Sequence, residues 1–181
     1  MKTYYCWLNQ NRLLPHLRTS FCALAIVGTS LTLPSAEAGT PISVTGGFFP
    51  CFTYAGPPRQ VGDNTIVTFN VTTTATGDFD GTLEGTELDV IHRDGSITLH
   101  GVALFTGSLN GGPSGTLLFT YTGIGNAITG HENLRIVGGQ GTDGLANVHF
   151  QGRAEGDLGA PNPGCDVSGA GTYSGYVLFA P

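Results

Sequence analysis

Beyond residue 40, apolar and polar residues alternate in runs of about ten, and no window keeps a helical apolar spacing for three turns. Threonine, valine and aromatic residues are frequent within these runs, as is typical of β-strands. The alternation predicts strands at about residues 65–74, 82–92, 96–108, 115–123, 127–137, 145–155 and 171–179. A further short strand is predicted within residues 41–54.

The connections between these runs are short and rich in turn residues. Asp94-Gly95 is a strong two-residue hairpin signal, and residues 110–113, Gly125-Asn126 and 138–144 separate the following strands. Strands joined by such short turns are antiparallel neighbours, so the predicted order is a meander. A meander of this length forms either a sandwich or a barrel. The many glycines and the need to remove exposed strand edges favour an all-β antiparallel barrel of seven or eight strands.

The turns also predict which side chains face the barrel interior. A two-residue Asp94-Gly95 turn pairs Val90 with Leu99 and Glu84 with Phe105. This face carries most of the apolar residues of both strands, so we expect it to line the interior. The opposite face, which we expect to lie in solvent, carries Glu87, Asp89, His100 and Val102.

The next two hairpins extend the interior level across four strands. A three-residue loop at residues 111–113 places Phe119 opposite Phe105 and turns Tyr121 inward. A Gly125-Asn126 turn then pairs Phe119 with Glu132. Other residues predicted to face inward are Leu88, Ile97, Ala103, Leu117, Ile128, Leu134, Ile136, Ala146, Val148, Phe150 and Ala154.

This register places two carboxyl groups, Glu84 and Glu132, inside an apolar barrel beside Phe105, Phe119 and Tyr121. Burial raises the pKa of a carboxyl group, and two such groups facing one cavity can act as general acid and base. The aromatic residues are the candidate ligand-binding wall. The alternative is a structural role, with either glutamate at the barrel rim in water or bonded to threonine hydroxyls.

The N-terminus has the features of an export signal. Residues 21–33 are apolar, basic residues precede them, and Ala36-Glu37-Ala38 is a small-x-small cleavage signature. We expect residues 1–38 to be a removed signal peptide and residues 39–181 to form one barrel domain, secreted or periplasmic. A buried helix or a membrane anchor is the alternative. In an oxidising compartment, Cys51 and Cys165 are expected to form a disulfide.

Charge and composition argue against several classes of partner. Without residues 1–38, four arginines and twelve acids remain, a formal charge of −8. Such a chain repels phosphate backbones and anionic lipids, so we expect no nucleic-acid partner and no membrane contact beyond export. The scattered His92, His100, His131 and His149 predict no metal site, and no motif predicts a cofactor. The oligomeric state stays open.

The region of residues 79–179 resembles a family of uncharacterised small bacterial proteins with an allene oxide cyclase-like barrel. The resemblance rests on the segments at residues 81–85, 105–111 and 114–116, on Asp94-Gly95, and on residues 139–147. The last segment also looks like the glycine-rich segment of dirigent proteins, which share the barrel. The resemblance implies an eight-stranded barrel with an elongated apolar cavity, whose relatives guide cofactor-free ring closures or couplings. Of the two candidate catalytic residues, only Glu84 lies in one of these motifs.

Three functions fit these observations. The first is an exported barrel that binds a small apolar or aromatic molecule in its interior. The second is a cofactor-free isomerase or cyclase that uses Glu84 and Glu132. The third is a structural or interaction module with a solid core.

Overall fold

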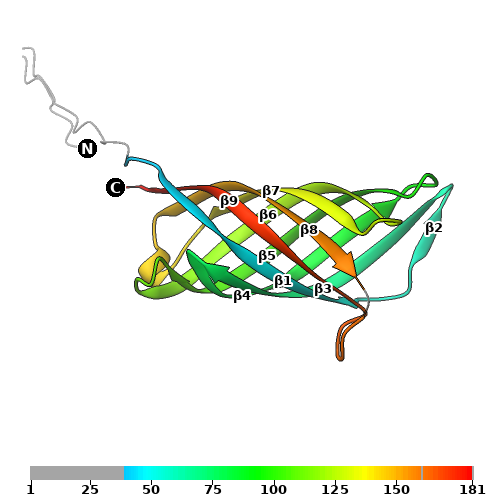
Figure 1. Cartoon of the computed structure of the whole chain (residues 1–181), viewed down its shortest axis with the longest axis horizontal. Coiled ribbons are helices and arrows are strands. Elements are labelled where there is room, and N and C mark those ends of the chain that lie inside the picture. Colours follow the sequence, from blue (N-terminus) through cyan, green and yellow to red (C-terminus); the bar gives the residue numbers. More distant parts are fainter. Residues whose placement is uncertain (1–38, 160, 181) are drawn as a thin grey trace, which may run out of the picture. The chain divides into compact units, whose positions relative to one another are not determined.

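The alternating segments form nine strands that run obliquely around a common interior (Figure 1). The structure is a computed structural model that describes residues 39–159 and 161–180, so the predicted signal peptide lies outside the described residues. The strands are β1 (Ile42–Tyr54), β2 (Arg59–Val61), β3 (Asn64–Gly77), β4 (Phe79–Ile91), β5 (Ser96–Leu109), β6 (Ser114–Asn126), β7 (His131–Gly139), β8 (Val148–Gly159) and β9 (Val167–Phe179). A short 3₁₀ helix, η1 (Asp143–Leu145), lies between β7 and β8.

The sheet closes on itself through β1. This strand pairs antiparallel with β9 on one side and with β3 on the other, while β3 to β9 follow one another in chain order. Eight strands therefore form a closed antiparallel barrel, and the short β2 pairs with β3 at one end. The predicted all-β meander barrel is confirmed. The predicted short strand within residues 41–54 is in fact a strand of 13 residues, because it supplies the closure.

The interior contains two apolar clusters at opposite ends of the barrel. At the end that carries η1, Phe79 packs edge-to-face against Phe105, Phe119 and Phe150 with ring centroids 5.4–5.6 Å apart. Leu145 of η1 is buried against this cluster. At the end that carries β2, the buried cluster consists of Phe52, Val67, Phe69 and Val71. We call these the η1 end and the β2 end of the barrel.

The connection between β4 and β5 is one residue longer than predicted. Ile91 pairs with Ile97, and the three-residue loop 93–95 ends at Gly95, whose φ is 83°. A type I turn followed by a left-handed residue is the usual three-residue hairpin loop. The Asp94 carboxylate stabilises it by accepting hydrogen bonds from the Ser96 backbone N–H (3.0 Å) and hydroxyl (2.7 Å).

This one-residue difference exchanges the two faces of β4 relative to β5. The predicted interior residues of β5 are confirmed, since Leu99, Ala103 and Phe105 are buried. The prediction that Glu84, Leu88 and Val90 share this face is wrong. Glu84 pairs with Leu104 and is exposed on the outside, whereas Glu87 and Asp89, predicted to be in solvent, are buried inside.

The next two hairpins also differ in register, but by an even number of residues. Phe105 pairs with Leu117 and not with Phe119, because the loop spans residues 109–113, with Asn110 and Gly111 in the left-handed region. Glu132 pairs with Gly125 and not with Phe119. Even shifts preserve the face, so the predicted inward orientation of Phe119 and Glu132 is confirmed.

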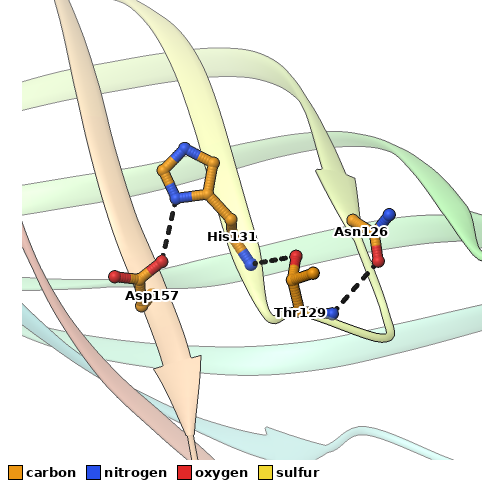
Figure 2. A network of polar contacts seen from close by, with 4 residues as sticks. All are labelled: Asn126, Thr129, His131 and Asp157. Carbon is orange, nitrogen blue, oxygen red and sulfur yellow. Dashed lines mark hydrogen bonds and ion pairs between the residues drawn. The ribbon is translucent and has the colours of Figure 1, made fainter.

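The turn between β6 and β7 occupies residues 127–130 and is built on the Asn126 side chain (Figure 2). Asn126 Oδ1 accepts hydrogen bonds from the backbone N–H groups of Ile128 (2.8 Å) and Thr129 (3.1 Å). Beyond the turn, His131 Nδ1 lies 2.8 Å from Asp157 Oδ1 of β8. The prediction that Ile128 faces inward is wrong, since its side chain is 82% exposed.

The predictions for β8 and for the disulfide agree with the structure, except at Ala146. Val148, Phe150 and Ala154 are buried as predicted, but Ala146 is exposed because it follows η1 and precedes β8. The predicted disulfide is confirmed, and Cys51 and Cys165 join β1 to the β8–β9 loop. Among the described residues, no helix is long and apolar enough to cross a membrane.

Candidate functional site

A cavity of about 100 Å³ lies inside the barrel between the two apolar clusters. Toward the η1 end its wall consists of aromatic rings. Toward the β2 end it meets polar groups, the side chains of Glu87, Tyr121 and Glu132. The predicted ligand-binding residues Phe105, Phe119 and Tyr121 all line this cavity, whereas Glu84 lies outside the barrel.

Three carboxyl groups gather at the polar end of this interior. Glu87 and Asp89 are alternate residues of β4, so both face inward, and Glu132 comes from β7. Their exposed fractions are only 3%, 4% and 6%. One carboxylate oxygen from each of the three lies within 4.8 Å of the other two. We call these residues the acid cluster.

Glycines on β5 and β6 allow the polar side chains to converge. Glu87, Gly101 and Tyr121 are paired across three neighbouring strands, and a Cβ at position 101 would overlap the Tyr121 ring and hydroxyl. The Tyr121 side chain therefore lies across Gly101 toward Glu87, and both line the same cavity. Glu132 lies in the same way over Gly125, where a Cβ would be 2.9 Å from its Cγ.

Burial dominates the electrostatics of the cluster. It raises the pKa of Glu87 to about 9, with further contributions from the charges of Asp89 and Glu132, while the Tyr121 hydrogen bond opposes the shift. Burial, together with the Asp89 charge, raises the pKa of Glu132 to about 7. The pKa of Asp89 rises to about 6, again through burial, against a hydrogen bond from Glu87 and the charge of His100. At neutral pH, Glu87 is therefore protonated and Asp89 mostly ionised.

The cluster has polar atoms without partners and no arginine of the described chain beside it. Glu87 Oε1, Asp89 Oδ1 and Glu132 Oε1 are buried and accept no hydrogen bond. The arginines of the described chain are exposed on the outside of the barrel or in its loops, at positions 59, 93, 135 and 153. Buried carboxyl groups of this kind are costly unless protons, ligands or counter-ions satisfy them, so they mark this end as the candidate site.

The sequence prediction placed one of the three acids correctly. Glu132 faces inward as predicted. Its acidic neighbours inside the barrel are Glu87 and Asp89, and not Glu84 as predicted. The β4 sequence contains a signal for the correct face. Phe79, Leu83 and Ile91 alternate in phase with Glu87 and Asp89, so the acids continue a face that is apolar at both ends.

The comparison with known families covers most of this site. A family model described as "Protein of unknown function (DUF3224)" matches residues 55–160, more than half of the chain. The chain belongs to this family. The matched region includes the whole acid cluster and Tyr121. The prediction of an uncharacterised family is thus confirmed, and its relation to allene oxide cyclase-like barrels stays a prediction.

A solved structure of the same family has a similar fold. It is the crystal structure of a protein with unknown function from the DUF3224 family of Shewanella oneidensis MR-1. It is 18% identical in sequence, the match covers 78% of this chain and 99% of that chain, and the TM-score is 0.60. At this identity the likeness shows the fold alone. No curated protein matches the chain.

A glycine substitution tests the convergence of Tyr121 on Glu87. We expect Gly101→Ala to destabilise the barrel by about 1–3 kcal/mol, because the added methyl group displaces the Tyr121 ring. Gly56→Ala is the matched control, since a Cβ there has no neighbour within 4 Å. Chemical denaturation measures both. The cost of Gly101→Ala should fall by more than about 0.5 kcal/mol in a Tyr121→Ala background, and equal costs in the two backgrounds would contradict the geometry.

The raised pKa values predict how stability depends on pH. Glu87 and Glu132 bind protons more tightly in the folded barrel than in the unfolded chain, where their pKa is near 4.5. Their stabilising contribution is thus fully present below about pH 4.5 and is lost as pH rises toward about 9. In metal-free buffer, Glu132→Gln should flatten this loss and add on the order of 1–3 kcal/mol at high pH.

Glu84→Gln provides the control for this measurement, because it makes the same chemical change on the outside of β4. Thermal unfolding between about pH 5 and pH 9 gives the slope for each variant. If Glu132→Gln and Glu84→Gln change that slope equally, Glu132 is not held in the barrel as described.

Proposed function

We propose that this barrel binds a small aromatic or apolar molecule that carries one polar group. The single observation behind the proposal is the interior cavity, which has an aromatic wall at one end and hydrogen-bonding groups at the other. Ligand sites are typically apolar cavities with a few convergent polar groups that fix the orientation of the ligand.

The apolar part of the ligand would contact the rings of Phe79, Phe105 and Phe119. These rings already pack edge-to-face, and an aromatic ligand would extend the same arrangement. A cavity of about 100 Å³ limits the ligand to a molecule about as large as a single aromatic ring.

The polar group of the ligand would meet Tyr121 and Glu87. The protonated Glu87 and the Tyr121 hydroxyl together offer both donors and acceptors, which suits a hydroxyl or carbonyl group. The polar end of the cavity would make binding selective, because a ligand without a polar group would leave the buried hydrogen-bonding groups of Tyr121 and Glu87 unsatisfied.

The cavity also bears on the other two functions considered from the sequence. It argues against a fully packed interior that serves as a structural module alone. Catalysis by a Glu84 and Glu132 pair lacks a basis, since Glu84 is outside the barrel. A closed eight-stranded barrel with an interior cavity agrees with the proposed allene oxide cyclase-like relationship, which we retain as part of this proposal.

Phenol and toluene are matched probes for this proposal, because they differ only in the polar group. We expect saturable binding of phenol with a Kd of about 1 mM or tighter by calorimetry. Tyr121→Phe should weaken phenol by roughly threefold to tenfold, the effect of one hydrogen bond, and leave toluene unchanged.

Filling the cavity gives the corresponding control pair. Ala103→Val adds two methyl groups to the cavity wall and should weaken both probes at least fivefold, whereas Ala146→Val makes the same change at an exposed position. The absence of saturable binding, or equal effects of the two valine variants, would rule out an interior binding site.

We also propose that the protein is exported to the periplasm or the extracellular space. The signal-like N-terminal sequence and the disulfide between Cys51 and Cys165 support this location. N-terminal sequencing of the protein from cell fractions tests it. A chain that begins near Gly39 outside the cytoplasm is expected, and an uncleaved cytoplasmic chain would contradict the proposal.

A further inference from the structure

The acid cluster has the geometry of a cation site as well as that of a polar cavity end. It brings together three carboxylate oxygens, one each from Glu87, Asp89 and Glu132, which all lie within 4.8 Å of one another. Oxygens that bind the same Ca²⁺ ion lie at most about 4.6–5.2 Å apart, because each is about 2.3–2.6 Å from the ion. The three oxygens can therefore contact one ion of calcium's size with little rearrangement.

A second observation is independent of this spacing. Glu132 is 6% exposed, lines the cavity, and has an Oε1 that accepts no hydrogen bond. Glu87 and Asp89 each have one unpartnered oxygen of the same kind. The polar group beside these acids is the neutral hydroxyl of Tyr121. Among the described residues, no cationic side chain inside the barrel balances the negative charge of the acids.

Space for further ligands adjoins the cluster. The main cavity is lined by Glu87 and Glu132, and a recess of about 10 Å³ is lined by Glu132 and Leu158. A recess of this size holds about one water molecule. Ca²⁺ takes six to eight oxygen ligands, so bidentate carboxylates and water molecules would complete its coordination.

We propose that Glu87, Asp89 and Glu132 form an interior binding site for one hard divalent cation of calcium's size. All three donors are carboxyl oxygens, the ligand type that Ca²⁺ prefers, and binding of the ion would release the Glu87 proton to solvent. The site has no nitrogen or sulfur donor that would favour Zn²⁺. The bound ion supplies the positive charge that the interior side chains lack. This site is distinct from the aromatic end of the cavity, and its test uses the metal ion alone.

The experiment is a titration of the metal-free full-length chain with CaCl₂ at about pH 8, followed by calorimetry and thermal unfolding. We expect one Ca²⁺ per chain and a saturable rise of several degrees in Tm. Mg²⁺ and Zn²⁺ should bind at least tenfold more weakly. No saturable effect up to about 10 mM Ca²⁺, or tighter binding of Mg²⁺ or Zn²⁺, overturns the proposal.

Neutral variants separate this site from ordinary exposed acids. Glu132→Gln and Asp89→Asn should each raise Tm in metal-free buffer, because they remove a buried acid, and should lose the rise produced by Ca²⁺. Glu84→Gln and Asp80→Asn make the same changes at exposed positions of β4 and should keep the full Ca²⁺ effect. If the exposed variants lose as much of the Ca²⁺ effect as the interior ones, the ion binds elsewhere and the proposal fails.

Terbium luminescence locates the ion by a second route. Tb³⁺ substitutes for Ca²⁺ and emits when a nearby aromatic side chain transfers excitation to it. Because Tyr121 lines the cavity beside Glu87 and Glu132, Tyr121→Phe should remove most of the sensitised emission while Ca²⁺ still displaces Tb³⁺. Unchanged emission in Tyr121→Phe would place the ion away from the cluster.

Discussion

The loop of residues 93–95 sets the register between β4 and β5, and the position of every interior acid of β4 depends on that register. Two hydrogen bonds from Ser96 to the Asp94 carboxylate, with Gly95 in the left-handed region, stabilise a loop of three residues. A two-residue loop would place Glu84 inside and leave Glu87 and Asp89 in solvent. A local contact on the barrel surface thus determines the chemistry of its interior.

Polar contacts inside the barrel lower the free-energy cost of burying the acids that this register places there. Tyr121 crosses Gly101 toward Glu87, where its hydroxyl opposes the rise in the pKa of Glu87, and Glu87 in turn opposes the rise in the pKa of Asp89. A buried acid is still destabilising relative to an apolar residue, so barrel closure and the Cys51–Cys165 disulfide, whose cysteines are 114 residues apart, must offset that cost. An arrangement that is unfavourable for stability and is nevertheless built by three strands is typical of a functional site.

The sequence predicted the fold well, because alternation and turn residues are local signals. They indicated the strands, the meander and the barrel. They did not indicate that the full length of β1 closes the barrel, because its pairing with both β3 and β9 joins segments distant in the sequence. Site prediction depended on loop length. Errors of two and six residues at the next hairpins left Phe119 and Glu132 on the correct face, whereas an error of one residue at Asp94-Gly95 replaced Glu87 with Glu84. Side-chain contacts such as that of Asp94 with Ser96 decided between these loops, and composition alone does not contain them.

The central claim is that Glu87, Asp89 and Glu132 share one buried cluster inside the barrel. A carbon-13 NMR titration of the side-chain carboxyl groups in metal-free buffer tests it most directly. We expect three carboxyl resonances to titrate above their usual range, with pKa values near 6, 7 and 9, and one of them to be lost in Glu132→Gln. If all the carboxyl groups titrate near their ordinary values, or if Glu84→Gln removes one of the three shifted resonances, the cluster described here does not exist.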